Sequence, residues 1–258
     1  MAFENSPFRY GQQQQPAGYA GTQVEVDQGL RSFMLGVYNN MIVGLGISGL
    51  VALGLNMASV AAYQGTRPVL TPFGVALYTS PLKWLLMLAP LAFIFVFSFR
   101  MDRMSASSAR TMFFAFAAVM GASMSTLLLV FTGASVVQVF FITAAAFGGL
   151  SLWGYTTRRS LSGMGSFLMM GLIGIIIASL VNIFLASSAM QFAISVLGVL
   201  IFAGLTAYDT QKLKEMYLYG GFDGEMAAKM SVNGALTLYL DFINMFQFLL
   251  ALVGNRNN

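Results

Sequence analysis

Two aspartates near the carboxyl end of the chain are the residues here that could do chemistry. Asp241 stands inside the apolar stretch 235–253, and Asp209 directly follows the apolar stretch 192–208. Inside a bilayer a carboxylate is costly unless it is paired or hydrated, so an ionisable residue at this depth indicates a functional site. We therefore treat Asp209 and Asp241 as the first candidate site.

The residue types that are missing narrow that chemistry. The chain contains no cysteine and no histidine, which excludes disulfides, thiol nucleophiles, imidazole bases and most zinc or haem ligation. Carboxylates, hydroxyls, amides and a few cations remain. We expect no catalytic residues and no cofactor.

The composition places these residues in a membrane. The chain is 57% hydrophobic and 9% charged, against about 25% charged residues in a soluble domain. Seven apolar stretches come near the ~20 residues that cross a bilayer, which predicts an all-α integral membrane protein with seven transmembrane helices. Glycines recur within these stretches, and we expect them to allow close helix approach. The predicted spans are 33–57, 84–99, 112–131, 136–155, 166–184, 192–208 and 235–253.

Residues 1–32 differ from the rest of the chain. They are polar, include the run from Gln12 to Gln15, and lack the apolar core of a signal peptide. We expect a disordered cytoplasmic tail here. One membrane domain follows over residues 33–258.

The distribution of positive charge predicts the orientation. A cytoplasmic amino terminus puts ten of the 13 Lys and Arg residues inside and leaves Arg67, Lys83 and Arg256 outside. This bias favours a cytoplasmic amino terminus and an outer carboxyl terminus. It also accounts for the net charge of +4, so we expect the lipid bilayer as a partner and no nucleic acid.

In this orientation Asp209 and Asp241 lie in the cytoplasmic third of the membrane on consecutive helices, and they could meet. Two neighbouring carboxylates in a poorly hydrated site cannot both ionise cheaply, so the pair would titrate in two coupled steps. One shared proton would join the helices. Its loss would leave two repelling anions that a nearby arginine or a calcium ion could stabilise. The sequence thus predicts gating by protons and calcium, with both aspartates as transient calcium ligands.

The last predicted helix also has a polar stripe. Thr237, Asn244 and Gln247 share with Asp241 an arc of about 120°. Such groups can hydrogen-bond to neighbouring helices and hold them together, or they can line a hydrated path with Asp241 as its charged element. We favour the hydrated path, because packing alone rarely requires an ionisable group.

Two segments carry a resemblance to a known family. Residues 202–214 (FAGLTAYDTQKLK) and 231–244 (SVNGALTLYLDFIN) resemble the carboxyl-terminal signature of the Bax inhibitor-1, or transmembrane Bax inhibitor motif, family. LAPLAF at 88–93 and GYTT at 154–157 are similar to bacterial members. The resemblance covers about residues 30–253 and includes both aspartates.

This resemblance implies a fold and a function. The last helix would be central and wrapped by the other six. The protein would be a pH-sensitive calcium leak channel of the bacterial cell inner membrane, with Asp209 and Asp241 as its pH sensor and gate and with calcium ion as the candidate permeant ion or ligand. An arginine near the end of the second helix, Arg100 or Arg103, would be the gate partner.

Two other functions compete with the channel. Intramembrane aspartyl proteases also place two aspartates on their sixth and seventh helices, but the second aspartate here lacks their Gly-x-Gly context and no proline follows Pro90. We therefore expect no enzyme. The alternative that stays open is a non-conducting regulatory membrane protein that binds a membrane protease or another complex. Such a protein would depend on the tail 1–32 and not on the aspartates.

Reporter fusions test the predicted orientation. A reporter that works only outside the cytoplasm should be active when fused after Asn258 and silent when inserted at Ser105, because the positive-inside bias puts the first outside and the second inside. A reporter that works only in the cytoplasm should give the opposite pattern. Both sites on one side of the membrane would contradict the seven-span topology.

Overall fold

The computed structural model of the protein describes residues 17–64, 67–222 and 224–257, with side chains from residue 28 onward except that of Asp102. Helices make up nearly all of it. The elements run in the order α1 (Ala17–Ser59), β1 (Val60–Gln64), β2 (Arg67–Leu70), α2 (Pro72–Thr79), α3 (Leu82–Arg100), the 3₁₀ turn η1 (Met101–Arg103), α4 (Ala106–Met124), α5 (Leu127–Val130), α6 (Gly133–Thr156), α7 (Ser162–Leu185), α8 (Ser188–Gly220) and α9 (Gly224–Val253).

Within these residues, seven helical segments are long and apolar enough to cross a membrane. The predicted all-α integral membrane fold with seven spans is therefore confirmed. The segments are Gln28–Ser59, Leu82–Arg100, Ala106–Val130, Gly133–Thr156, Ser162–Leu185, Ser188–Gly220 and Gly224–Val253.

Hydroxyl side chains begin the helices that follow two of the tight connections. The side chain of Thr132 accepts a hydrogen bond from the N–H of Ser135, and that of Ser187 accepts one from the N–H of Met190, each over 3.3 Å. Such caps satisfy backbone N–H groups that lack a partner in the first helical turn. They let α6 and α8 start immediately after the preceding helix, as hairpins in a membrane require.

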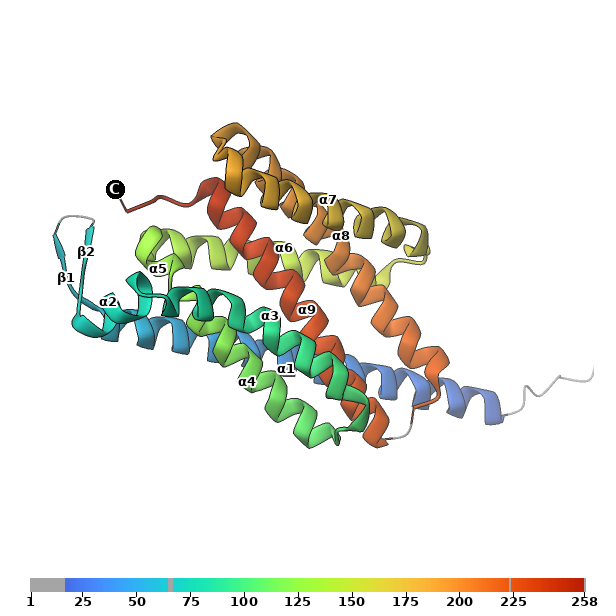
Figure 1. Ribbon diagram of the computed structural model, residues 1–258. Coiled ribbons are helices and arrows are strands. Elements are labelled where there is room, and N and C mark those ends of the chain that lie inside the picture. The colour runs from blue at the N-terminus through green and yellow to red at the C-terminus, as the bar shows by residue number, and fades with distance from the viewer. Residues whose placement is uncertain (1–16, 65–66, 223, 258) are drawn as a thin grey trace, which may run out of the picture.

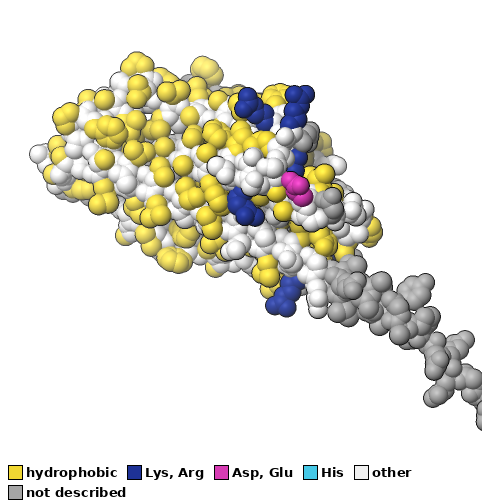
Figure 2. Space-filling view, turned by 90° about the horizontal axis from the view of Figure 1, so that it is seen from below, with side chains coloured by type: hydrophobic (Ala, Val, Ile, Leu, Met, Phe, Trp, Pro, Cys, Tyr) yellow, Lys and Arg dark blue, Asp and Glu magenta, His cyan; other side chains and the backbone are white. Residues whose placement is uncertain are grey.

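Helix α9 lies in the middle of the bundle (Figure 1) and packs against α1, α4, α6 and α8. Half of its most apolar part is buried (50%), against 33% or less in the other spans. The remaining two spans lie further out, because α3 packs on α4 and α7 packs on α8. On the face drawn in Figure 2, Lys and Arg side chains gather toward one end of the molecule, and hydrophobic side chains cover most of the rest.

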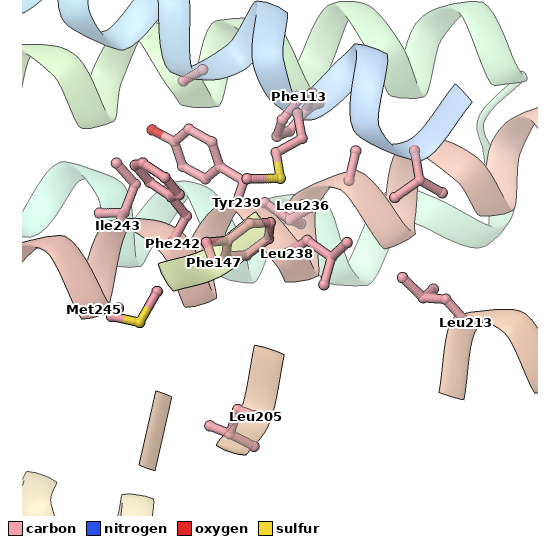
Figure 3. Packing of buried hydrophobic residues seen from close by; sticks show 14 of the residues in the cluster. Phe113, Phe147, Leu205, Leu213, Leu236, Leu238, Tyr239, Phe242, Ile243 and Met245 are labelled. Carbon is pink, nitrogen blue, oxygen red and sulfur yellow. The ribbon is translucent and has the colours of Figure 1, made fainter. Parts of the chain in front are cut away.

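Aromatic side chains of α9 fill the space toward its neighbours (Figure 3). The ring of Tyr239, fully buried, meets Phe113 of α4 edge-on with centroids 5.6 Å apart. Phe242 meets Phe140 and Phe147 of α6 at 5.4 and 5.6 Å. Edge-to-face pairs of this kind contribute about 0.5–1.5 kcal/mol beyond their buried area. They fix α9 between α4 and α6.

The structure differs from the sequence analysis in three places. The disordered tail predicted over residues 1–32 is wrong for residues 17–32, because α1 already begins at Ala17 and no proline interrupts it; residues 1–16 lie outside the described part. The predicted span 112–131 is two helices, α4 and α5. The connection after the first span, to which sequence analysis assigned no element, holds the antiparallel pair β1–β2 and helix α2.

Glycines bring some helices into contact, but not all of them. A Cβ on Gly121 would meet the carbonyl of Ser48 in α1, and a Cβ on Gly154 would meet the carbonyl of Ala207 in α8. Backbone contact of this closeness is what small residues allow in membranes. The expectation is wrong for five glycines of the apolar stretches, whose added Cβ would meet nothing within 4 Å: Gly46, Gly49, Gly148, Gly149 and Gly174.

These two kinds of glycine should respond differently to alanine. Gly154→Ala should destabilise the protein by about 1–3 kcal/mol, because the methyl group forces α6 away from α8. Gly148→Ala, six residues earlier in α6, should be neutral or stabilising by up to ~1 kcal/mol, since alanine is the better helix former. Thermal unfolding of the purified protein in detergent measures both. Equal effects of the two substitutions would contradict the packing described here.

Candidate functional site

The structure brings Asp209 of α8 and Asp241 of α9 together. Their carboxyl groups are within hydrogen-bonding range of each other. Asp241 is 4% exposed, whereas Asp209 is half-buried. The contact follows from the sequence locally, because α8 and α9 are consecutive antiparallel helices that pack extensively and each carries one aspartate near the same depth.

The pair needs a proton or a cation. No donor among the described residues reaches Oδ2 of Asp241, although this atom is fully buried. A buried carboxylate oxygen without a partner is strongly disfavoured. One proton shared between the two carboxyl groups supplies the missing hydrogen bond, as in other carboxylate pairs in poorly hydrated sites. In that form the pair joins α8 to α9.

A cation lies near Asp209. Lys212, one turn along α8, interacts electrostatically with Asp209, and its Nζ lies 5.9 Å from the centroid of the Tyr208 ring. The predicted gate partners Arg100 and Arg103 are exposed and form no ion pair with either aspartate in the part of the chain described. The reason is that α3 packs chiefly on α2 and α4 rather than on α8 or α9.

A chain of hydroxyls lies beside Asp209 and was missed by sequence reasoning. The hydroxyl of Tyr38 in α1 lies 2.7 Å from Oγ of Ser151 in α6, which lies 3.0 Å from Oγ1 of Thr210 in α8. Thr210 donates in turn to the carbonyl of Thr206 over 2.7 Å. When Tyr38 donates to Ser151 and Ser151 donates to Thr210, every hydroxyl hydrogen in the chain has an acceptor. The chain ties three helices together next to the aspartate pair.

A second hydroxyl cluster fixes α9 on its other side. The hydroxyl of Tyr239 lies 2.6 Å from Oγ of Ser48, which lies 2.7 Å from the carbonyl oxygen of Ala117. These contacts join α9, α1 and α4. Serine and threonine within apolar runs signal such bonds only weakly, because they also bond to their own helix. Tyr239, a buried tyrosine two residues before Asp241 in the motif LTLYLD, was the available signal.

The predicted polar stripe of α9 lies on its less buried side. Thr237, Asn244 and Gln247 are half-buried, unlike Asp241. Thr237 donates to the carbonyl of Asn233 over 3.2 Å, and Asn244 donates to that of Leu240 over 2.8 Å. Both bonds stay within α9. Within the described part of the chain, the side chains of Thr237 and Asn244 thus donate hydrogen bonds to their own helix and to no neighbouring helix.

The aspartate pair is a small site for a metal ion. Calcium takes six to eight oxygen ligands in stable protein sites. The described residues contain no cluster of three or more acidic, His or Cys side chains that could hold a metal. The transient calcium contact expected at Asp209 and Asp241 stays a prediction.

Comparison with known proteins places the chain among membrane proteins of bacteria. A sequence model of the family described as "Inhibitor of apoptosis-promoting Bax1", the Bax inhibitor-1 family, matches residues 30–258. An uncharacterized protein of Caulobacter vibrioides is 48% identical over 90% of this chain and 92% of its own length. The inner membrane protein YbhL of Escherichia coli is 43% identical over 90% of this chain and 95% of its own.

Substitutions at Asp241 test the contact. Asp241→Leu should destabilise the protein by about 1–3 kcal/mol more than Asp241→Asn, because the amide keeps a hydrogen-bonding partner for Asp209 and leucine removes it. Unfolding in detergent measures the difference.

The double variant Asp209→Leu/Asp241→Leu is the control, since it leaves no carboxyl without a partner. It should recover part of the stability lost in Asp241→Leu. A double variant whose loss equals the sum of the two single losses would mean that the carboxyl groups do not interact.

Proposed function

This chain belongs to the Bax inhibitor-1 family, and we propose that it is a pH-sensitive calcium leak channel gated by the aspartate pair. The observation that carries the proposal is the contact between Asp209 and Asp241 on two neighbouring spanning helices. Residues that only pack helices together rarely require an ionisable group at this depth, and a pair of carboxyls is sensitive to both protons and divalent cations.

Protonation changes the force between α8 and α9. With one shared proton the carboxyl groups attract each other through a hydrogen bond. Without it, two anions face each other in surroundings that screen charge poorly, and the helices repel. A calcium ion that reaches the pair replaces the proton as the neutralising charge. One site thus responds to pH and to the permeating ion.

In this proposal the ion conduction path runs along the polar stripe of α9. Thr237, Asn244 and Gln247 succeed one another along the less buried side of α9, and Asp241 lies among them in the sequence. Because the polar groups of Thr237 and Asn244 bond only within their own helix, their remaining lone pairs are free to meet water or an ion. This arrangement favours conduction along α9.

The proposed setting is a bacterial inner membrane, the membrane in which the relative YbhL is found. We orient the amino terminus toward the cytoplasm and the carboxyl terminus outside, in line with the positive charge bias. Asp209 and Asp241 then face the cytoplasmic side. We assign the chain no enzymatic activity, because Asp241 lacks the Gly-x-Gly context of intramembrane aspartyl proteases and no proline follows Pro90.

Calcium flux into liposomes that contain only this purified protein tests the proposal. The flux should change with pH, and Asp209→Asn or Asp241→Asn should each remove more than about half of that change, because a lone carboxyl lacks the neighbour that couples two titration steps. Glu215→Gln is the matched control. It removes one negative charge from an exposed position of α8 and should keep the wild-type profile.

Two results would contradict the proposal. Absence of calcium flux at every pH would rule out the channel function. Full wild-type pH dependence in both aspartate variants would make the pair a structural contact, and the regulator that binds a membrane protease or another complex would become the better function.

A further inference from the structure

A long groove opens on the side of the molecule between α1 and α6. Its volume is about 1770 Å³, larger than the ~300–1,000 Å³ of a pocket for a small molecule. Phe242, Ile243 and Phe246 of α9, all buried, form its floor. The aspartate pair does not line it. The groove is therefore separate from the site described above.

The groove exists because α1 and α6 both pack on α9 but barely on each other. The hydrogen bond between Tyr38 and Ser151 crosses between its walls. Three glycines leave the space between the walls open: Gly46 and Gly49 of α1 and Gly148 of α6 line the groove, and a Cβ on any of them would meet nothing within 4 Å. Neighbouring helices do not fill this space.

The length of the groove matches the membrane. Its lining on α1 extends from Arg31 to Leu53, which corresponds to about 33 Å of helix at 1.5 Å per residue. The hydrocarbon core of a bilayer is ~30 Å thick. The groove therefore runs along the membrane normal and suits an extended apolar ligand.

One end of the groove is cationic. Arg31, an exposed residue, lines it at that end. Across from it, Tyr155 of α6 lines the groove, and Lys214 donates from Nζ to the carbonyl of Tyr155 over 2.8 Å while lying 5.2 Å from the centroid of its ring. Among the residues that the structure describes, no acidic side chain lines the groove. An anionic group is the complement of this end.

We propose that the groove binds a phospholipid with an anionic headgroup from the leaflet on the Arg31 side. An acyl chain lies between α1 and α6 on the floor formed by α9, and the phosphate lies at Arg31 with Lys214 close by. A second copy of the chain fits less well, because a helix is ~10 Å wide and the Tyr38–Ser151 bond crosses the groove. A single acyl chain is far thinner.

Filling the groove tests the proposal without disturbing the protein. In Gly46→Leu/Gly148→Leu the new side chains enter open space inside the groove, and leucine is a better helix former than glycine. The matched control is Gly149→Leu/Gly174→Leu. These positions are equally open but do not line the groove. Both variants should unfold at or above the wild-type temperature.

Lipid retention is the measurement. Each protein is reconstituted in vesicles of equal parts phosphatidylglycerol and phosphatidylcholine, extracted in mild detergent, and examined by native mass spectrometry. The wild type and the control should retain phosphatidylglycerol, and the groove-filling variant should retain several-fold less. Arg31→Gln should reduce the preference for phosphatidylglycerol about fivefold, the effect of one cation at a membrane surface.

Three results would overturn the proposal. Undiminished retention in the groove-filling variant would mean that the lipid binds elsewhere. Equal loss in the control would mean that the lipid only surrounds the protein. A wild-type dimer that the groove-filling variant converts to a monomer would identify a second copy of the chain as the occupant.

Discussion

The lack of water inside a bilayer is the constraint on which the rest of the structure depends. Every polar group on a spanning helix must find its partner within the protein, since hydrocarbon offers none. Asp241 needs such a partner more than any other residue of α9, because it is an ionisable group near the middle of an apolar helix. A helix that carries such a residue is best placed at the centre. Accordingly α9 is the most buried span and has neighbours on four sides.

The same constraint explains how the neighbours of α9 are fixed. In a bilayer, apolar side chains gain little by leaving lipid for another helix, so association depends on close packing and polar contacts. Hydroxyl bonds join α9 to α1 and α4 through Ser48 and Tyr239, and join α1, α6 and α8 through Ser151. Glycines at the crossings of α1 with α4 and of α6 with α8 let the backbones touch. The contact between Asp209 and Asp241 thus lies in rigid surroundings.

The sequence predicted the seven spans because an apolar run of membrane length rarely forms anything but a spanning helix. It also predicted that Asp209 and Asp241 could meet, since consecutive helices carry them at one depth. It could not tell which glycines touch another helix, because Gly154 and Gly148 stand in the same apolar run and differ only in the face they occupy. Hydropathy likewise marks a span without giving its neighbours, so the distance of Arg100 and Arg103 from the pair was not predictable. The groove between α1 and α6 was not predictable either, because hydropathy does not show which spans pack on each other.

Backbone hydrogen bonds hold the segment that follows α9, and this limits where a change at the aspartate pair can act. Beyond the carboxyl-terminal end of α9, the carbonyl of Asn255 accepts from the N–H of Thr132 over 2.9 Å, and the N–H of Asn257 donates to the carbonyl of Val130 over 2.8 Å. These backbone bonds attach the end of the chain to the α5–α6 connection. They do not depend on the charge of the pair. A change in the force between Asp209 and Asp241 therefore acts on the contact of α9 with α8, while the carboxyl-terminal end of α9 stays attached.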